Sequence, residues 1–382
     1  MNEVKINSTP VRTSQNYQIN DIAITMKSDE NVSSFTNCFL QDFDANHINI
    51  SSITDELSLT YGNGKQLEKQ VRECCNKKMQ LTFQENSMQE NMVHFIFDKE
   101  NCTLIDDIEI IVPDNCEGKM TIRYATSLKE EGQYILYQEQ NTNWKNIATR
   151  MEGPTCTESG YHNGVIRAKL GKNAKLKLTV VNTLGEEITN LIALENHLEG
   201  KANLEYTIVD FGGNSSVTNY YADLIGEESE NNLDAIYLGT NHQLLDMNYI
   251  VAMHGAKTKV NMDVQGALKE EAKKHFKGTI DFKRGCKKAE GSENEFCMLL
   301  SDSAKSISLP MLLCDEEDVV GNHAAAAGKV SNKELFYIMS RGLTEKEAKI
   351  LLIRAKFNKV IDKISNDDLK EEIIRELESK LE

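Results

Sequence analysis

The chain has 382 residues, of which 40% are hydrophobic and 27% charged, and its formal net charge is −16. This composition is typical of a soluble globular protein, and the length suits one large domain or two to three smaller parts. The negative charge repels phosphate backbones, so we expect no sequence-independent binding of nucleic acid. A partner with a basic face would suit this charge, although solubility alone also explains it.

Neither a membrane span nor a secretory signal is expected. No apolar run approaches the 18 residues that a membrane-spanning helix needs, and the N-terminus has no apolar signal core. The nine cysteines are odd in number, scattered, and never spaced as Cys-x-x-Cys. This pattern indicates reduced thiols rather than a disulfide framework, and it predicts a cytoplasmic protein.

The N-terminal region, residues 1–79, is mostly polar. Residues 1–35 lack periodicity, and we expect them to be a loosely ordered lead-in. Residues 64–79 are different, because Leu67, Val71 and Cys74 or Cys75 recur at helical spacing. One short helix is predicted there.

From residue 80 to residue 330, short runs of alternating apolar and polar residues follow one another. Period two is typical of strands with one buried face; examples are 121–124, 165–170, 176–181, 204–209, 260–264 and 296–300. Small residues that begin a polar turn punctuate these runs, and glycine supplies positive φ at tight corners. Examples are Gly171, Gly200, Gly213, Gly255 and Ser303. This loose self-similarity favours stacked β coils, a solenoid, with a β-sandwich as the alternative.

Residues 331–382 change to helical patterns. Two segments, Ser331–Glu334 and Thr344–Glu347, fit the capping box that opens a helix, and Gly342 suits the end of the first helix. The third helix is predicted from about Asp367, with apolar residues at four-residue spacing: Leu369, Ile373, Leu377 and Leu381. A C-terminal helical domain on a mainly β body follows.

A glycine-rich segment, Gly321–Lys329, looks like a phosphate-binding loop but does not fit one. Six residues separate Gly321 from the Gly-Lys pair, where such a loop has four, and Val330 stands where Ser or Thr would hold magnesium. We therefore expect no nucleotide binding here.

Four ordered segments of the second half carry a family resemblance. They are Pro310–Val330, Glu334–Ala348, Leu299–Lys305 and His275–Gly285. They resemble the SufB/SufD family, the non-ATPase scaffold proteins of the SUF machinery for iron–sulfur cluster assembly, and they are closer to the SufD branch. The resemblance covers roughly residues 160–365.

The resemblance implies a right-handed parallel β-helix over 80–330. It also implies that helices in 331–382 dock a SufC-like ABC ATPase, and that the chain pairs with a second copy or with a SufB-like subunit near the C-terminal end of the β-helix. The nascent cluster would form at that interface, with sulfur from a cysteine desulfurase. No stand-alone enzymatic reaction is implied, and the isolated chain would hold a transient cluster or none.

His323 stands where SufD proteins carry a functional histidine, so the resemblance makes it a cluster ligand or an interface residue; the alternative is a turn histidine that caps backbone groups. The two best-known SufB-type ligands are replaced by Ala304 and Ala324. Thiolates are the usual ligands of such clusters, so Cys286, Cys297 and Cys314 are candidate substitutes. A cysteine buried in a strand, as expected for Cys297, is usually inert.

The candidate ATPase-docking surface lies on the first two helices of the C-terminal region. It consists of Leu335, Phe336, Tyr337, Arg341, Leu351 and Leu352. Two short helices cannot bury all of the apolar positions here, although any one of them could instead belong to the core of the helical domain.

Two other functions remain open. A β-helix enzyme acting on polysaccharides would need carboxylates that converge on one face of the coils, and the Asp and Glu residues do not recur at matched strand positions. A purely structural SUF subunit would differ only in that His323 and the cysteines never contact metal.

Overall fold

The computed structural model describes residues 2–12, 19–28, 32–84, 86–87, 89–126, 133–136, 146–148 and 159–382. Most of them form two long sheets, which we call sheet I and sheet II. Sheet I contains, in spatial order, β10 (Asn146–Ala148), β9 (Gln133–Leu136), β3 (Cys38–Gln41), β6 (Asn91–Ile96), β8 (Glu117–Ala125), β12 (Lys175–Thr183), β14 (Asn203–Asp210), β16 (Glu230–Gly239), β18 (Lys259–Leu268), β20 (Ala289–Leu299) and β22 (Val319–Lys329). Sheet II contains β21 (Lys305–Cys314), β19 (Lys273–Phe282), β17 (Leu244–Met253), β15 (Ser215–Leu224), β13 (Ile188–Leu198), β11 (Gly160–Leu170), β7 (Thr103–Val112), β5 (Lys77–Phe83) and β4 (Ile48–Ser51).

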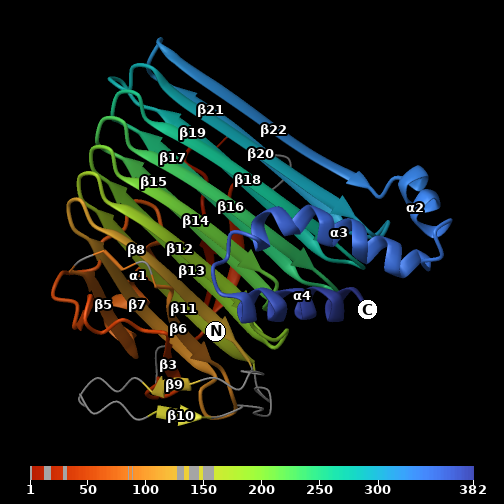
Figure 1. Ribbon diagram of the computed structural model, residues 1–382, viewed down its shortest axis with the longest axis horizontal. Helices are drawn as coiled ribbons and strands as arrows, with labels where there is room; N and C mark the ends of the chain where they lie inside the picture. The colour runs from red at the N-terminus through yellow and green to blue at the C-terminus, as the bar shows by residue number, and fades with distance from the viewer. Residues whose placement is uncertain are drawn as a thin grey trace.

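From β11 to β22 the chain alternates between the two sheets, so each pair of successive strands makes one coil of a β-solenoid (Figure 1). Strands of neighbouring coils are parallel and in register there; Tyr206 of β14, for example, lies beside Leu178 of β12 and Leu233 of β16. The pairings of β3, β4, β9 and β10 at the other end are antiparallel, whereas β6 pairs parallel with β8 and β5 with β7. The prediction of a solenoid rather than a sandwich is confirmed. The right hand of the coil stays a prediction, as does the division of the chain at residues 79/80 and 330/331.

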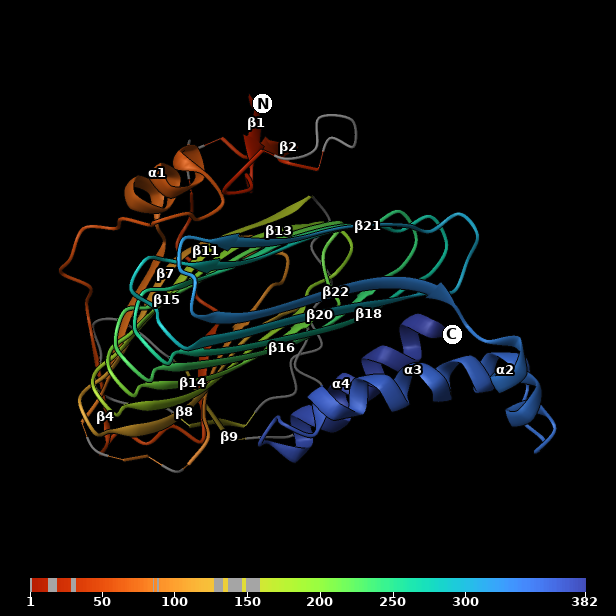
Figure 2. The ribbon, with the colours of Figure 1, turned by 90° about the horizontal axis from the view of Figure 1, so that it is seen from above.

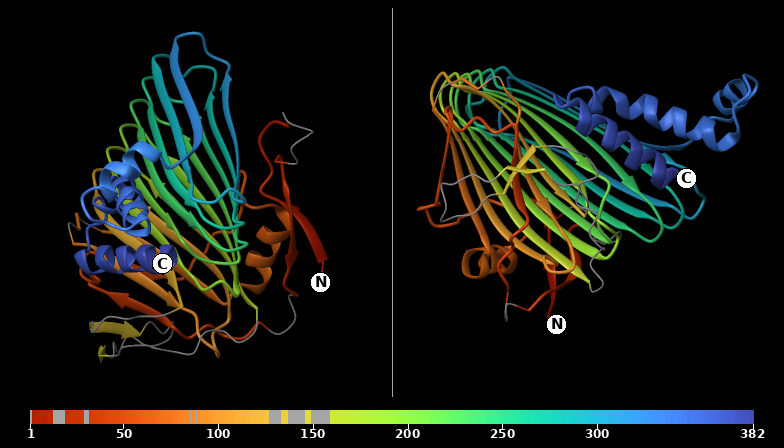
Figure 3. Two further views of the ribbon diagram at one scale, coloured as in Figure 1. Left: turned by 90° about the vertical axis from the view of Figure 1, so that its right-hand side faces the viewer. Right: turned by 60° about the horizontal axis from the view of Figure 1, so that its bottom comes forward.

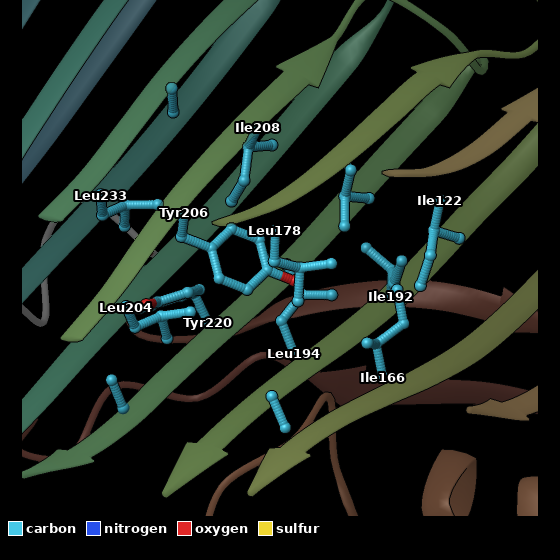
Figure 4. Close-up of a cluster of buried hydrophobic side chains, with 14 of the residues drawn as sticks. Ile122, Ile166, Leu178, Ile192, Leu194, Leu204, Tyr206, Ile208, Tyr220 and Leu233 are labelled. Atoms are coloured by element: carbon cyan, nitrogen blue, oxygen red, sulfur yellow. The ribbon is translucent and has the colours of Figure 1, made fainter. Parts of the chain in front are cut away.

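The solenoid interior, or lumen, is filled by side chains that alternate inward along each strand. Apolar residues from both sheets meet there, as the close-up in Figure 4 shows for Leu178, Ile192, Leu194 and Ile208. Alternation places every second residue of a strand on the same face, so in-register stacking aligns like with like from coil to coil. The buried lumen therefore extends along the row of coils up to β20, whereas β22 is mostly exposed.

Glycines at the corners act only in part as the sequence suggested, and Gly213 has the expected positive φ, 86°. At Gly171, Gly200 and Gly255, the positive φ falls on a neighbouring residue, such as Asn173 or Lys201, with φ of 57° and 59°. At Gly171 and Gly255 the glycine is needed because neighbouring turns approach closely; a Cβ on Gly255 would lie 2.2 Å from the carbonyl oxygen of Gly226, whereas a Cβ on Gly200 would make only an ordinary contact. Close approach of backbones is a second common use of glycine.

The N-terminal region is more ordered than expected. β1 (Asn2–Ile6) pairs antiparallel with β2 (Ile22–Met26), and α1 (Lys65–Cys74) confirms the predicted helix. These elements cover the outer face of sheet II (Figure 2). Asn7 anchors them there, since its amide donates a hydrogen bond of 2.6 Å to buried Asp246, which also accepts one of 2.6 Å from Lys277.

The C-terminal helices α3 (Glu345–Ile361) and α4 (Asp367–Leu381) cover the outer face of sheet I (Figures 2 and 3). All four predicted apolar positions of α4 are buried. Phe357 of α3 stacks on Phe211 with ring centroids 6.0 Å apart. Ion pairs flank this contact: Lys359–Asp263, Lys363–Asp234 and Arg123–Glu372.

Of the two capping boxes that the sequence predicts, one is present in the structure and the other is not. Thr344 and Glu347 form the predicted capping box, whereas Ser331 caps α2 (Asn332–Met339) without a side-chain hydrogen bond. That second capping box was predicted wrongly. Gly342 does have a positive φ of 101°, three residues beyond the last residue of α2. Within the described ranges, no helix has both the length and the apolarity to cross a membrane.

Candidate functional site

His323 lies on β22, the strand that ends sheet I, and its side chain is exposed. β22 pairs with β20 on one side only, and His323 is in register with Glu293. Parallel in-register neighbours point to the same face, so the pleat directs His323 to the lumen face of the sheet. Among the described residues, no further strand of the sheet lies beyond β22, and this end of the solenoid is therefore open.

A polar cluster is buried in the lumen beside this open end. Lys274 donates hydrogen bonds of 2.8 Å to Glu295 and 2.9 Å to Ser308, and both charged side chains are fully buried. Glu295 also accepts from the hydroxyls of Tyr237 at 2.7 Å and of Ser308 at 2.9 Å. Each charge of the ion pair thus has at least two hydrogen bonds, which helps a charge pair to persist in the interior.

Glu293 belongs to the same face of β20 but differs from Glu295. It is fully buried, and within the described part of the chain its two carboxylate oxygens have no hydrogen-bond partner. Burial, with a smaller contribution from the charge of Glu295, raises the pKa of Glu293 to about 8. The pKa of an unperturbed glutamate side chain is far lower.

The candidate cysteines do not join His323 in one ligand set. Cys297 shares the lumen face of β20, but it is in register with Ala327, four residues along β22 from His323. At ~3.3 Å per residue this corresponds to about 13 Å. Cys297 is fully buried, and burial raises the pKa of its thiol, so the inert interpretation fits it better than ligation does.

Cys286 and Cys314 form a second location, at the turns that follow sheet II. Cys286 is buried in the turn between β19 and β20, and burial raises the pKa of its thiol to about 11. Cys314 ends β21 and is exposed. The acidic run Asp315–Asp318 forms the next turn, where Glu316 accepts a hydrogen bond of 2.9 Å from the backbone N–H of Gly285. Cys156 lies outside the described residues.

No group of three or more His, Cys, Asp or Glu residues suited to a metal ion occurs within the described ranges. The sequence had not singled out Glu293, Glu295 or Lys274. The signal for the two glutamates was the alternation of β20, which places Glu293, Glu295 and Cys297 on one face. Only the structure shows that this face of β20 is the lumen.

A second candidate surface lies on α2 and the start of α3. Phe336 and Tyr337 are 76% and 60% exposed, and Leu351 is also exposed. Arg341 packs its guanidinium over the ring of Tyr337 at 5.2 Å from the centroid. Leu335 is buried and Leu352 is half-buried, so these two are less accessible than the other members of the predicted docking surface. Figures 1 and 2 show α2 projecting beyond the solenoid.

The glycine-rich segment Gly321–Lys329 is part of β22. Its extended backbone cannot wrap a phosphate as a loop does before a helix. The expectation that it is no phosphate-binding loop is therefore supported by its conformation.

Together, these features describe a solenoid that presents a histidine and a buried polar cluster at an open end, with an exposed apolar helix beside it. A sequence comparison identifies the family. The family described as "SUF system FeS cluster assembly, SufBD core domain" matches residues 130–356, more than half of the chain, and the protein belongs to this family.

Relatives with curated names agree. The chain is 24% identical over 212 residues to the iron–sulfur cluster assembly protein SufD of Bacillus subtilis, covering 55% of this chain and 48% of that protein. It is 23% identical over 261 residues to an iron–sulfur cluster assembly SufBD family protein of Staphylococcus haemolyticus, covering 68% of this chain and 54% of that one. The chain thus spans about half the length of these relatives.

Proposed function

We propose that this chain is a SufD-like scaffold subunit of a SUF iron–sulfur cluster assembly complex in the cytoplasm, and that it catalyses no reaction alone. The observation that supports this proposal most is that His323 is exposed at the open end of the solenoid, in a chain that belongs to the SufBD family. A neutral imidazole is a competent ligand for iron, and an open sheet end is a natural place for a second subunit to complete the site. Iron and sulfide are the cargo, with sulfur delivered from a cysteine desulfurase.

The partner at the open end is a second copy or a SufB-like subunit. β21 and β22 are the terminal strands of their sheets, and such edges favour pairing with another chain. Of the candidate thiols, Cys314 is the most accessible, whereas Cys286 and Cys297 are buried. His323 and Cys314 are therefore the first residues to test as cluster ligands.

The ATPase partner would dock on α2. Phe336, Tyr337 and Leu351 form an apolar surface that Arg341 borders, and this pattern suits a helix that inserts into a groove of a SufC-like ABC ATPase. ATP binding and hydrolysis would act through the helices, because an ATPase with different affinities for two shapes of the scaffold shifts the balance between them.

The test is anaerobic co-expression with the SufC-like ATPase of the same organism, followed by size-exclusion chromatography and measurement of iron and sulfide. We expect co-elution with the wild-type chain and with Lys333→Ala, a polar control on α2. The double variant Phe336→Ala, Tyr337→Ala should abolish co-elution. The variant His323→Ala should still co-elute with the ATPase but should contain less iron and sulfide. Unchanged iron and sulfide in His323→Ala would instead indicate a purely structural subunit.

A further inference from the structure

Glu293 is a buried acid for which the described part of the chain supplies no partner. Both of its oxygens lack hydrogen bonds, while Lys274 is already bonded to Glu295 and Ser308. An unpaired buried carboxylate destabilises a fold, whereas an apolar residue of similar size would not. A positive ligand that binds at this point would remove the cost.

The fold makes room for this carboxylate. It reaches across the lumen from β20 of sheet I to Gly278 of β19 in sheet II. A Cβ on residue 278 would lie 2.0 Å from Oε1 of Glu293, so only glycine leaves the space that the carboxylate occupies. Gly278 has no positive φ, and therefore close approach rather than backbone conformation accounts for the glycine.

His323 is the in-register neighbour of Glu293 on the terminal strand. Adjacent strands are ~4.8 Å apart, and both side chains are on the lumen face of sheet I. Two long side chains that leave neighbouring strands on the same face can both reach one ion in the lumen. Because His323 is exposed, an ion can reach its imidazole from solvent at the open end, beside the buried carboxylate of Glu293.

We propose that Glu293 and His323 together form a two-residue site for a divalent transition-metal ion. Ferrous iron is the ion in the function proposed above, on which this assignment of the metal rests. Carboxylate and imidazole are both suitable ligands for ferrous iron, and the carboxylate offsets part of its charge. Two protein ligands leave further positions for water, sulfide or groups of a second subunit, consistent with the absence of a three-residue metal group from the described residues.

The primary experiment is an anaerobic titration of the isolated full chain with Co²⁺, whose visible absorption reports its ligands. Glu293→Gln keeps the shape of the side chain and removes its ability to ionise, which metal ligation requires. Glu290→Gln is the matched control, since Glu290 is exposed and three residues earlier on the same strand. We expect wild type and Glu290→Gln to bind Co²⁺ alike, and Glu293→Gln and His323→Ala each to weaken binding at least tenfold.

A second variant, Gly278→Ala, perturbs the site without replacing either proposed ligand. The added methyl group would displace the carboxylate of Glu293, and Co²⁺ affinity should fall while far-ultraviolet circular dichroism stays that of a folded solenoid. The near-ultraviolet thiolate band separates binding by cysteines from binding at this pair. Wild-type affinity in folded Glu293→Gln would overturn the proposal.

The same variants in the complex with the ATPase separate this proposal from the function on which it rests. Loss of iron in His323→Ala but not in Glu293→Gln would keep the scaffold function and refute the role of Glu293. Loss of iron in both variants supports both the scaffold function and the metal-binding role of Glu293. Unchanged iron in both would remove His323 from the cluster site, while weakened Co²⁺ binding in the isolated variants would still support a metal pair.

Discussion

Phe357 provides the sharpest test of how the C-terminal helices are held on the solenoid. Its ring is 1% exposed and stacks on Phe211 of sheet I. Replacing a buried phenylalanine by alanine costs about 3–5 kcal/mol, from lost burial and the cavity left behind. Because the ring lies between α3 and the outer face of the sheet, Phe357→Ala should weaken the docking of the helices and leave the lumen intact.

The matched control is Phe336→Ala, which removes a ring of the same size that is 76% exposed. Its effect on stability should stay within about 0.5 kcal/mol. At about 1.4 kcal/mol per tenfold, the Phe357 change raises the undocked population about a hundredfold or more. The assay is limited proteolysis of residues 331–382 at low protease concentration, where cleavage follows the population of the open state. Equal cleavage rates for the two variants would refute this account.

Three further predictions concern single residues of the body. Burial raises the pKa of Asp210 to about 6, against the hydrogen bonds from Ser216 and Asn182 that lower it. The folded state therefore binds the proton more tightly, and stability should fall by roughly 3 kcal/mol as pH rises from about 4 to about 6. Asp210→Asn should remove that part of the slope in denaturant unfolding; an unchanged slope would contradict it. A Cβ on Gly226 would lie 2.0 Å from the backbone nitrogen of Gly200, so Gly226→Ala should lower the melting temperature by several degrees, and a neutral effect would show that the stacked turns can separate. Mass spectrometry after brief alkylation at pH 8 should find Cys314 modified well before Cys286, because burial hides the Cys286 thiol and raises its pKa to about 11; the reverse order would mean that the turns open readily.

The solenoid could be predicted because its signal is local. Period-two alternation depends on a few residues at a time, and it placed strands such as 176–181 and 204–209 correctly. The N-terminal strands could not be predicted in this way. Their order depends on contacts more than 200 residues away in sequence, such as that of Asn7 with Asp246. No pattern within residues 1–35 predicts such a distant contact.

The candidate site was predictable only in part. His323 followed from a family resemblance, and the structure gives it an exposed position on a terminal strand. Glu293 escaped notice because both sheets are covered on their outer faces as well, by the N-terminal elements and by α3 and α4. Alternation tells which residues share a face, but an acidic residue on a doubly covered sheet gives no indication that its face is the interior.

The last coil, formed by β21 and β22, has a neighbouring coil on one side only, and this affects its motion. In a stacked repeat, each unit is stabilised by the units on either side, and an end unit receives that support once. Backbone amides of β21 and β22 should therefore exchange with deuterium faster than those of β13 to β16. Fraying confined to this coil would let iron, sulfide and a second subunit reach the site at low free-energy cost, while the rest of the solenoid stays folded.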